Sequence, residues 1–166
     1  MFAWEFEQMQ NIAEKNGWTK FISMQNHYNP IYREEEREMI PLCQDRKVAL
    51  IPWSPLAGGR CAHPWGTQTA RVVIDEVSKW VWDSTNDLDK VVIDNIEKLA
   101  KVRGISMAQM SLAWMLSKPF ITSPIVGTTS VQHVEEAVAA LDIQLTVDEI
   151  NALEKPYVTH PVLGMM

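Results

Sequence analysis

The sequence predicts an α/β fold in which a parallel sheet is covered by helices. Short apolar runs alternate with longer segments of helical periodicity along the 166 residues, an order typical of parallel strands joined by crossover helices. Turn-forming residues such as Pro, Gly and Asn bound the apolar runs. Three strands are expected, and three strands cannot cover both faces and both edges of a sheet by themselves.

The first third of the chain predicts two helices and two strands. Apolar side chains recur near helical spacing from Trp4 to Ala13, and Gly17 stops the pattern. A second helical segment is acidic at its start and apolar near its end. The predicted elements are a helix over about 4–16, a strand at 21–25, a helix at 33–42 and a strand at 48–51.

The rest of the chain predicts a long connection followed by four helices and one strand. Residues 58–90 are irregular, and a connection of this length inside a compact domain is usually functional or disordered. Gly104 ends one helix, while Ser106 and Thr146 each stand three residues before Gln or Glu, the spacing of a capping box. The predicted elements are helices over about 90–102, 106–118, 130–141 and 146–155, and a strand at 123–127.

Composition and charge exclude several classes of function. The net charge of −6 and the absence of a Lys/Arg cluster argue against a nucleic-acid partner. No apolar stretch reaches the roughly 18 residues that span a membrane, and the N-terminus lacks the pattern of a signal peptide. Cys43 and Cys61 are too few for a disulfide framework or a zinc site. We therefore expect a cytoplasmic location and a small-molecule or protein partner.

The tract 51–59 is the most informative part of the sequence. It places an aromatic ring, Trp53, directly after a predicted buried strand, followed by Ser54 and the pair Gly58 and Gly59. The ring can cover a planar heterocycle, and the hydroxyl and the glycine amides can meet phosphate oxygens. The alternative is a Pro/Gly-rich turn whose Trp53 packs in the core.

Polar residues follow each of the three predicted strands. Gln25 and Asn26 end the first, Trp53 and Ser54 the second, and the tract 127–130 the third. The third tract also lies at a helix N-terminus, which can bind an anion. Simple N-capping of that helix is the alternative, but the shared position at strand ends favours a cofactor phosphate.

Three motifs, taken in this order, resemble the aldo-keto reductase family of NAD(P)H-dependent oxidoreductases. The segment 32–39 (YREEEREM) is similar to the branch of fungal aryl-alcohol dehydrogenases and versiconal hemiacetal acetate reductase. The resemblance implies that residues 1–166 are a partial domain, the C-terminal portion (about strands six to eight with their helices) of a (β/α)8 TIM barrel, without the N-terminal half. The motifs are FISMQNHYNP at 21–30, IPWSPLAGG at 51–59, and SPIVGTTS at 123–130 with Glu135 and Glu136 following.

The resemblance implies a nicotinamide dinucleotide site. The cofactor is expected to be NADP, with NAD not excluded, because His133 and Ala137 stand where the family often has Arg and Asn. His133 could donate to a phosphate, or it could be an exposed helix residue. By resemblance, Gln25 binds the carboxamide and Trp53 stacks on the nicotinamide; Ser54, Leu56, Gly58 and Gly59 line the pyrophosphate; and Gly127, Thr128, Thr129, Ser130, His133 and Glu136 surround the adenosine end.

The family's catalytic residues have no counterpart in this sequence. The family reduces carbonyls with a Tyr proton donor assisted by Lys, Asp and His, whereas Tyr28, Tyr32 and Tyr157 lie in other contexts. We expect an oxidoreductase of aldehydes, ketones and aryl alcohols at the level of the family, with no catalytic residue and no metal ligand in this chain. The alternatives are an inactive half-barrel that binds a dinucleotide, or a partner through its open sheet edges, or a degenerate remnant.

Other polar and aromatic residues have structural interpretations. His27 is expected in a loop or substrate-pocket role rather than as a catalytic base. The acidic run 34–36 is expected to be a solvated helix start that suits the helix dipole rather than a metal cluster. The Trp residues at 65, 80 and 82 either close over the cofactor or pack against the outside of the fold.

Overall fold

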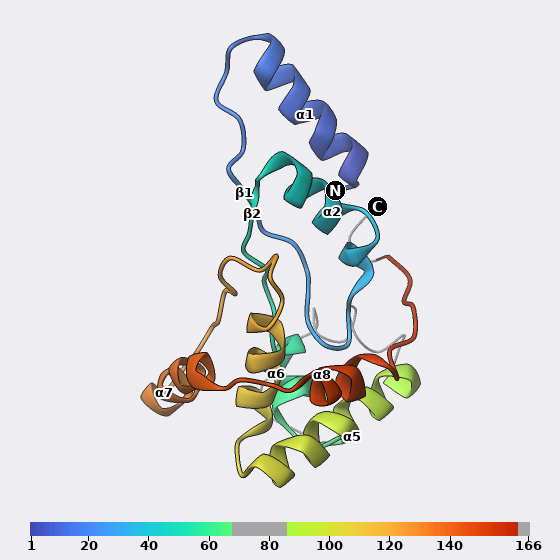
Figure 1. Cartoon of the computed structure of the whole chain (residues 1–166), viewed down its shortest axis with the longest axis vertical. Helices are drawn as coiled ribbons and strands as arrows, with labels where there is room; N and C mark the ends of the chain where they lie inside the picture. The colour runs from blue at the N-terminus through green and yellow to red at the C-terminus, as the bar shows by residue number, and fades with distance from the viewer. Residues whose placement is uncertain (68–85, 163–166) are drawn as a thin grey trace.

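The computed structural model describes residues 1–67 and 86–162. The described elements follow one another as helices and two short strands, with three 3-10 helices labelled η (Figure 1). They are α1 (Ala3–Lys15), β1 (Ser23–Met24), η1 (Glu34–Glu36), α2 (Met39–Arg46), β2 (Ala49–Leu50), η2 (Ala57–Ala62), α5 (Asn86–Arg103), α6 (Met107–Leu116), α7 (Val131–Ala139), η4 (Ala140–Asp142) and α8 (Val147–Glu154).

The predicted parallel pairing of the first two strands is confirmed. Ser23 lies opposite Ala49, and Met24 lies opposite Leu50. The regular ladder is shorter than the predicted strands, but pairing continues as a parallel bridge between His27 and Trp53. The carboxyl ends of β1 and β2 therefore stay side by side beyond the strands.

The predicted strand at 123–127 is wrong. Ile121 forms an isolated parallel bridge with Leu50, and Ile125 N donates to Pro52 O at 2.9 Å. Between them stands Pro124, which has no N–H to donate to a ladder. The segment therefore lies along β2 without forming a regular strand.

The single helix predicted at 33–42 is also wrong. The helix forms as η1, is interrupted at Glu38 (φ −138°, ψ −53°), and resumes as α2. Pro41 explains the break, because a Pro is tolerated in the first turn of a helix but disrupts hydrogen bonding further along. Pro41 is the third residue of α2.

The other helix predictions agree with the structure to within a few residues. The capping boxes of Ser106 and Thr146 are formed: each hydroxyl accepts from the backbone N–H three residues later. The helix predicted to start near residue 90 begins earlier, at Asn86. The helix predicted over 130–141 is α7 continued by η4.

The core lies between the short sheet and the helices. Leu50 of β2, Ile96 of α5, and Met110 and Trp114 of α6 are buried in one cluster. Figure 1 shows α5, α6 and α8 grouped at one end of the molecule and α1 beside α2 at the other. Among the described residues, no helix is long and apolar enough to cross a membrane.

Candidate nucleotide-binding site

The carboxyl ends of β1 and β2 bring two of the predicted site residues to one place. Trp53 N donates to Asn26 O at 2.9 Å, which keeps the two strand ends in register. Gln25 is exposed at the end of β1, and the Trp53 side chain is 38% exposed beyond β2. Trp53 is therefore not packed in the core, and one polar amide and one aromatic ring are both open to a ligand here.

His27 covers one face of Trp53. The two rings are stacked with centroids 4.1 Å apart, and Tyr32 stacks on the other side of His27 at 4.3 Å. Burial lowers the pKa of His27 to about 3, so the imidazole is neutral at physiological pH. His27 therefore packs behind Trp53 and supports that ring. This role fits the structure better than the role of a catalytic base.

The loop 54–59 has a strained backbone. Ser54 (φ 53°) and Ala57 (φ 51°) occupy the left-handed region, and so do Gly58 and Gly59. Residues other than glycine rarely adopt this region, and strained conformations cluster at binding and catalytic sites. A Cβ at Gly59 would lie in ordinary contact with His63 Cδ2 at 4.0 Å but would be strained by its φ of +103°.

The loop amides are already bonded within the loop. Gly58 N donates to Ser54 Oγ at 3.2 Å, and Gly59 N donates to Leu56 O at 2.8 Å. The expectation that both glycine amides are open to a phosphate is thus wrong for this conformation. A phosphate at this loop can still accept from the Ser54 hydroxyl, because that hydroxyl retains its own proton.

The third predicted tract is open to solvent at the start of α7. Gly127, Thr128, Thr129 and Ser130 are all exposed, and His133 is exposed in the first turn of the helix. Ser130 Oγ accepts from His133 N at 3.3 Å, so the capping role is formed. Capping uses one amide and leaves other first-turn amides available to an anion.

Glu136 is turned toward α6. Its carboxylate accepts from the Ser106 hydroxyl at 3.3 Å and from Gln132 Nε2 at 3.2 Å. α7 packs against α6, and α6 in turn packs against η2. The structure thus connects the third tract to the loop 54–59 through α6, while Ile125 N ties it to the end of β2.

Comparison with known proteins identifies the family. The model of the Aldo/keto reductase family matches residues 3–157. This chain belongs to the aldo/keto reductase family. It is 52% identical to versiconal hemiacetal acetate reductase of Aspergillus parasiticus over 95% of this chain and 46% of that protein.

Other fungal relatives are matched over similar shares of the two chains. An aldo-keto reductase of Fusarium vanettenii is 41% identical over 99% of this chain and 44% of its own length. A protein of Saccharomyces cerevisiae named as an aryl-alcohol dehydrogenase is 42% identical over 95% of this chain and 46% of its own length. The resemblance drawn from the sequence motifs is confirmed, and the chain spans about half the length of the curated relatives it matches.

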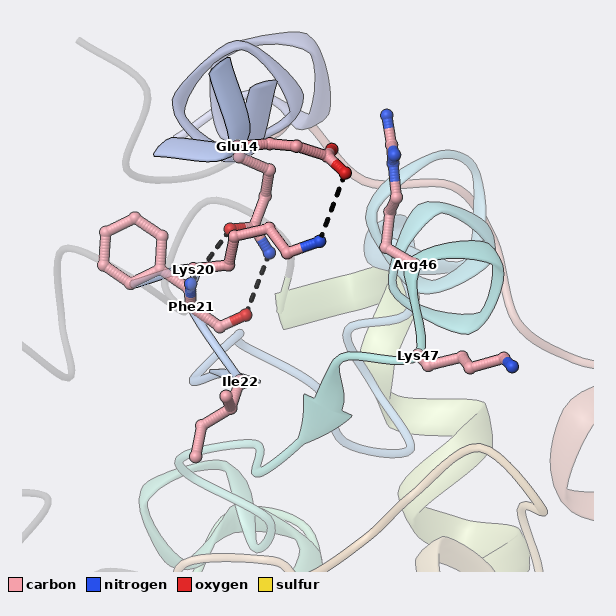
Figure 2. A pocket seen from close by; sticks show the side chains of 7 residues that line it. Glu14, Lys20, Phe21, Ile22, Arg46 and Lys47 are labelled. Carbon is pink, nitrogen blue, oxygen red and sulfur yellow. Dashed lines mark hydrogen bonds and ion pairs between the residues drawn. The ribbon is translucent and has the colours of Figure 1, made fainter. Parts of the chain in front are cut away.

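A hollow of about 210 Å3 lies at the opposite end of the two strands in this aldo/keto reductase chain (Figure 2). Figure 2 shows Lys20 pointing toward Glu14, and the two groups are 3.7 Å apart. Gln10 exchanges two 2.9 Å hydrogen bonds with the backbone of Phe21. The polar groups at this end of the strands bond to one another, and the polar strand ends of the sequence motifs lie at the other end. The hollow is lined by Gln10, Glu14, Lys20, Phe21, Ile22, Arg46 and Lys47.

The acidic run 34–36 is not the solvated face that the sequence predicts. Glu34 is only 6% exposed, and its carboxylate accepts from the Tyr157 hydroxyl and from His160 N, each at 2.7 Å. Arg37 Nε lies 2.9 Å from the same carboxylate. No group of three possible metal ligands occurs within residues 1–67 and 86–162. Glu34 therefore anchors the C-terminal segment to η1.

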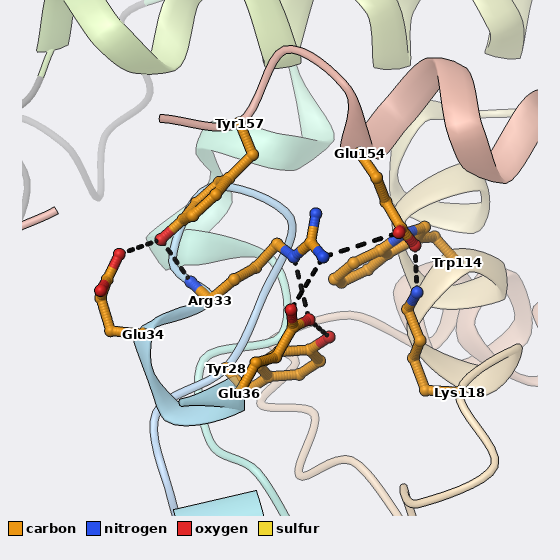
Figure 3. A network of polar contacts seen from close by, with 8 residues as sticks. All are labelled: Tyr28, Arg33, Glu34, Glu36, Trp114, Lys118, Glu154 and Tyr157. Carbon is orange, nitrogen blue, oxygen red and sulfur yellow. Dashed lines mark hydrogen bonds and ion pairs between the residues drawn. The ribbon is translucent and has the colours of Figure 1, made fainter. Parts of the chain in front are cut away.

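Glu36 belongs to a second, adjoining set of paired groups (Figure 3). Arg33 donates to its carboxylate at 2.9 and 2.8 Å, and the Tyr28 hydroxyl donates at 2.5 Å. Burial alone would raise the pKa of Glu36, but the hydrogen bonds from Arg33 and Tyr28 hold that pKa below its ordinary value. Burial and the nearby Glu36 charge raise the pKa of Tyr28.

Glu154 of α8 extends this network to α6. Its carboxylate accepts from Trp114 Nε1 at 3.0 Å and pairs with Lys118, while Arg33 lies 3.5 Å away. The Arg33 guanidinium also lies over the rings of Trp114 and Tyr157. Sequence reasoning missed this network, because its members come from three separate segments, and Arg33 and Glu154 are more than 100 residues apart.

His160 and Asp89 form a buried pair that no sequence motif indicates. His160 Nε2 lies 2.7 Å from Asp89 Oδ1, and both side chains are almost fully buried. Burial would lower the pKa of His160, but the Asp89 carboxylate raises it above its ordinary value. The pair fastens the C-terminal segment to the first turn of α5.

The structure leaves one buried amide without a partner among the described residues. Both side-chain polar atoms of Asn26 are buried and unbonded. Trp65 is partly buried against the core, which matches packing on the fold. Trp80 and Trp82 lie outside the described residues.

Proposed function

We propose that this chain forms the cofactor-binding part of an aldo/keto reductase that interconverts aldehydes or ketones and alcohols, aryl alcohols included, with NADP. One observation carries the proposal: the half-exposed ring of Trp53, backed by His27, stands beside the exposed amide of Gln25 at the carboxyl ends of paired parallel strands. Ligands of α/β proteins bind at that end of the sheet. The names of the fungal relatives support the reaction class.

The residues fit a nicotinamide dinucleotide. The Gln25 carboxamide can both donate to and accept from the nicotinamide carboxamide, and the open face of Trp53 can stack on the planar ring. The bound nicotinamide supplies a hydride to a carbonyl carbon. Trp53 orients that ring, and its bulk excludes water from one face.

The phosphates and the adenosine are assigned to two loops. Ser54, Leu56, Gly58 and Gly59 line the pyrophosphate, and the Ser54 hydroxyl donates to it. Gly127, Thr128, Thr129, Ser130, His133 and Glu136 surround the adenosine end. The exposed position of His133 at the first turn of α7 supports contact with the 2′-phosphate of NADP, since cations and N–H donors there meet phosphate. NAD remains the competing cofactor.

We assign no proton donor within this chain. The hydroxyl of Tyr28 donates to the partly buried Glu36 and that of Tyr157 to the buried Glu34, and burial raises the pKa of both tyrosines. Residues 1–166 then correspond to strands six to eight of a (β/α)8 barrel, represented by β1, β2 and the segment 121–125. The share of the relatives that is matched supports a partial domain. A cytoplasmic location is part of the same proposal.

Titration of purified 1–166 with NADPH and NADH, followed by Trp fluorescence, tests the proposal. We expect saturable quenching by NADPH at micromolar concentration, weaker quenching by NADH, and no carbonyl reduction by this chain alone. The matched control is Trp18→Phe, which removes an exposed Trp that precedes β1, whereas the proposed site follows it. Absence of saturable quenching by either nucleotide contradicts the proposal.

A second candidate function is pairing with another copy of the chain through β1. The carbonyls of Ile22, Met24 and Asn26 accept from β2 and the residues that follow it, up to Trp53, so the alternate carbonyls of Ser23 and Gln25 turn the other way. Ile22 is 81% exposed beside them, and an exposed sheet edge favours pairing. Light scattering would show a dimer that Ile22→Lys dissociates; a monomer at high concentration rejects this function.

A further inference from the structure

Asn29 is a fully buried polar residue that contacts both the loop 54–59 and His27, the ring behind Trp53. Its Oδ1 accepts from Ile31 N at 3.1 Å, and its Nδ2 donates to Ser54 O at 3.1 Å. The same Nδ2 lies 3.2 Å from His27 Nε2. The backbone of Asn29 exchanges two 3.1 Å hydrogen bonds with Tyr32, which fixes the position of the side chain.

The first group held by Asn29 is the strained start of the loop 54–59. Ser54 has a φ of 53°, and its carbonyl also accepts from Ala57 N at 2.9 Å. Ser54 occupies a conformation that costs free energy and persists only where surrounding contacts enforce it. The hydrogen bond from Asn29 is a contact of that kind, since it comes from outside the loop.

The second group is the imidazole of His27. His27 is neutral, so one ring nitrogen accepts a hydrogen bond and the other carries the proton. Donation from Asn29 to Nε2 favours the tautomer protonated at Nδ1 and fixes the rotation of the ring. Because His27 stacks on Trp53 at 4.1 Å, this rotation also determines the plane on which Trp53 rests.

We propose that Asn29 is a positioning residue, which uses one primary amide to hold both the Ser54 turn and the His27–Trp53 stack in the shape that binds the dinucleotide. The inference rests on the proposed function for its ligand. Two donors and one acceptor are required at this position, and of the acidic and amide side chains only an amide supplies them. Asp retains the acceptor for Ile31 N but has no proton for Ser54 O or His27.

The experiment compares Asn29→Asp with a matched Asn151→Asp change on the exposed side of α8. NADPH affinity is measured by Trp fluorescence, and the local stability of the loop by hydrogen–deuterium exchange of peptides covering 52–61. We expect Asn29→Asp to weaken NADPH binding about tenfold, because the hydrogen bonds that Asn29 donates to Ser54 O and to His27 are lost. Exchange of the loop amides should be faster, with exchange in α5 and α6 unchanged.

A suppressor variant separates positioning from a general loss of structure. Ser54→Gly accepts a positive φ without strain, so the turn no longer depends on the hydrogen bond from Asn29. The effect of Asn29→Asp on affinity and on loop exchange should therefore shrink in the Ser54→Gly background. If Asn29→Asp does not fold, Asn29→Ser replaces it, because the smaller neutral side chain leaves a hydroxyl near Ile31 N.

The outcomes distinguish this inference from the proposed function. If the wild type binds NADPH and the Asn29 variants match Asn151→Asp in affinity and exchange, the inference is wrong. An equal effect in the wild-type and Ser54→Gly backgrounds also contradicts it. If the wild type does not bind NADPH, the proposed function fails and so does the ligand named here, while faster loop exchange in Asn29→Asp would still support the hold on Ser54.

Discussion

Two polar regions of this molecule differ in how far their polar groups are exposed and paired. The strand-end region around Trp53 and the loop 54–59 is partly exposed and has a strained backbone. In the network around Glu34 and Glu36, Glu34 is buried, Glu36 is partly buried, and both carboxylates are paired. The contrast separates a surface with donors and a ring left open from a region whose polar groups are already satisfied. The first region, with its exposed ring and side-chain amide, is therefore the candidate binding surface.

The largest effect should come from the buried network. Glu34→Ala removes the acceptor for the Tyr157 hydroxyl and for His160 N, which leaves two buried donors unpaired. We expect a loss of about 3 kcal/mol in the free energy of unfolding, measured by urea denaturation. NADPH affinity of the folded fraction should stay close to wild type. Glu38→Ala, at an exposed position with no capping bond, is the control, and an equal loss there contradicts the account.

The opposite result is expected at the strand ends. Trp53→Ala removes the stacking ring and should weaken NADPH binding by about 30-fold, or about 2 kcal/mol. Fluorescence titration measures this affinity. Because the ring is partly exposed, the free energy of unfolding should fall by only about 1 kcal/mol. Trp18→Ala serves as the matched control. Unchanged affinity in Trp53→Ala would remove this surface from the binding site.

The His160–Asp89 pair predicts a pH dependence confined to the buried region. Since the folded pKa of His160 is raised above its ordinary value, the stabilisation is complete below pH 6.5 and is lost as pH rises through the folded pKa. The titratable groups facing His160 include Asp89, Glu34, Tyr32 and Tyr157. Urea denaturation from pH 5.5 to 8.5 should show this decline in the wild type and not in His160→Gln. A parallel decline in both proteins would assign it to other groups.

The smallest effect concerns the choice between capping and phosphate binding at Ser130. Loss of the cap in Ser130→Ala should lower the free energy of unfolding by about 1 kcal/mol. A phosphate contact predicts an additional loss of about threefold in NADPH affinity, whereas capping alone predicts none. Thermal unfolding and fluorescence titration measure the two separately. Thr146→Ala, which removes the cap of α8, should lower stability with no change in affinity.

Local signals in the sequence predicted the helices well. The capping boxes of Ser106 and Thr146 are formed by neighbouring residues, so the sequence contains everything needed to locate them. Pro41 and Pro124 carried local signals as well, and each explains a prediction that failed: one long helix and one extra strand. A proline removes a backbone donor, and greater weight on that fact would have corrected both elements.

Long-range contacts account for what could not be predicted. Glu34 meets Tyr157 and His160 across more than 120 residues, and no spacing rule connects such positions. The shared position of Gln25 and Trp53 could be predicted because each lies at the end of a strand, and parallel strands bring their carboxyl ends together. The stack of His27 behind Trp53 depends on side-chain packing, which the sequence pattern does not specify.

The most direct test of the central claim is an NMR measurement of nuclear Overhauser effects between bound NADP and the Trp indoles of 1–166. The account predicts contacts from the nicotinamide ring protons to the Trp53 indole, which disappear in Trp53→Phe. Contacts of the nicotinamide with other residues only, in a chain that binds NADP, would contradict it.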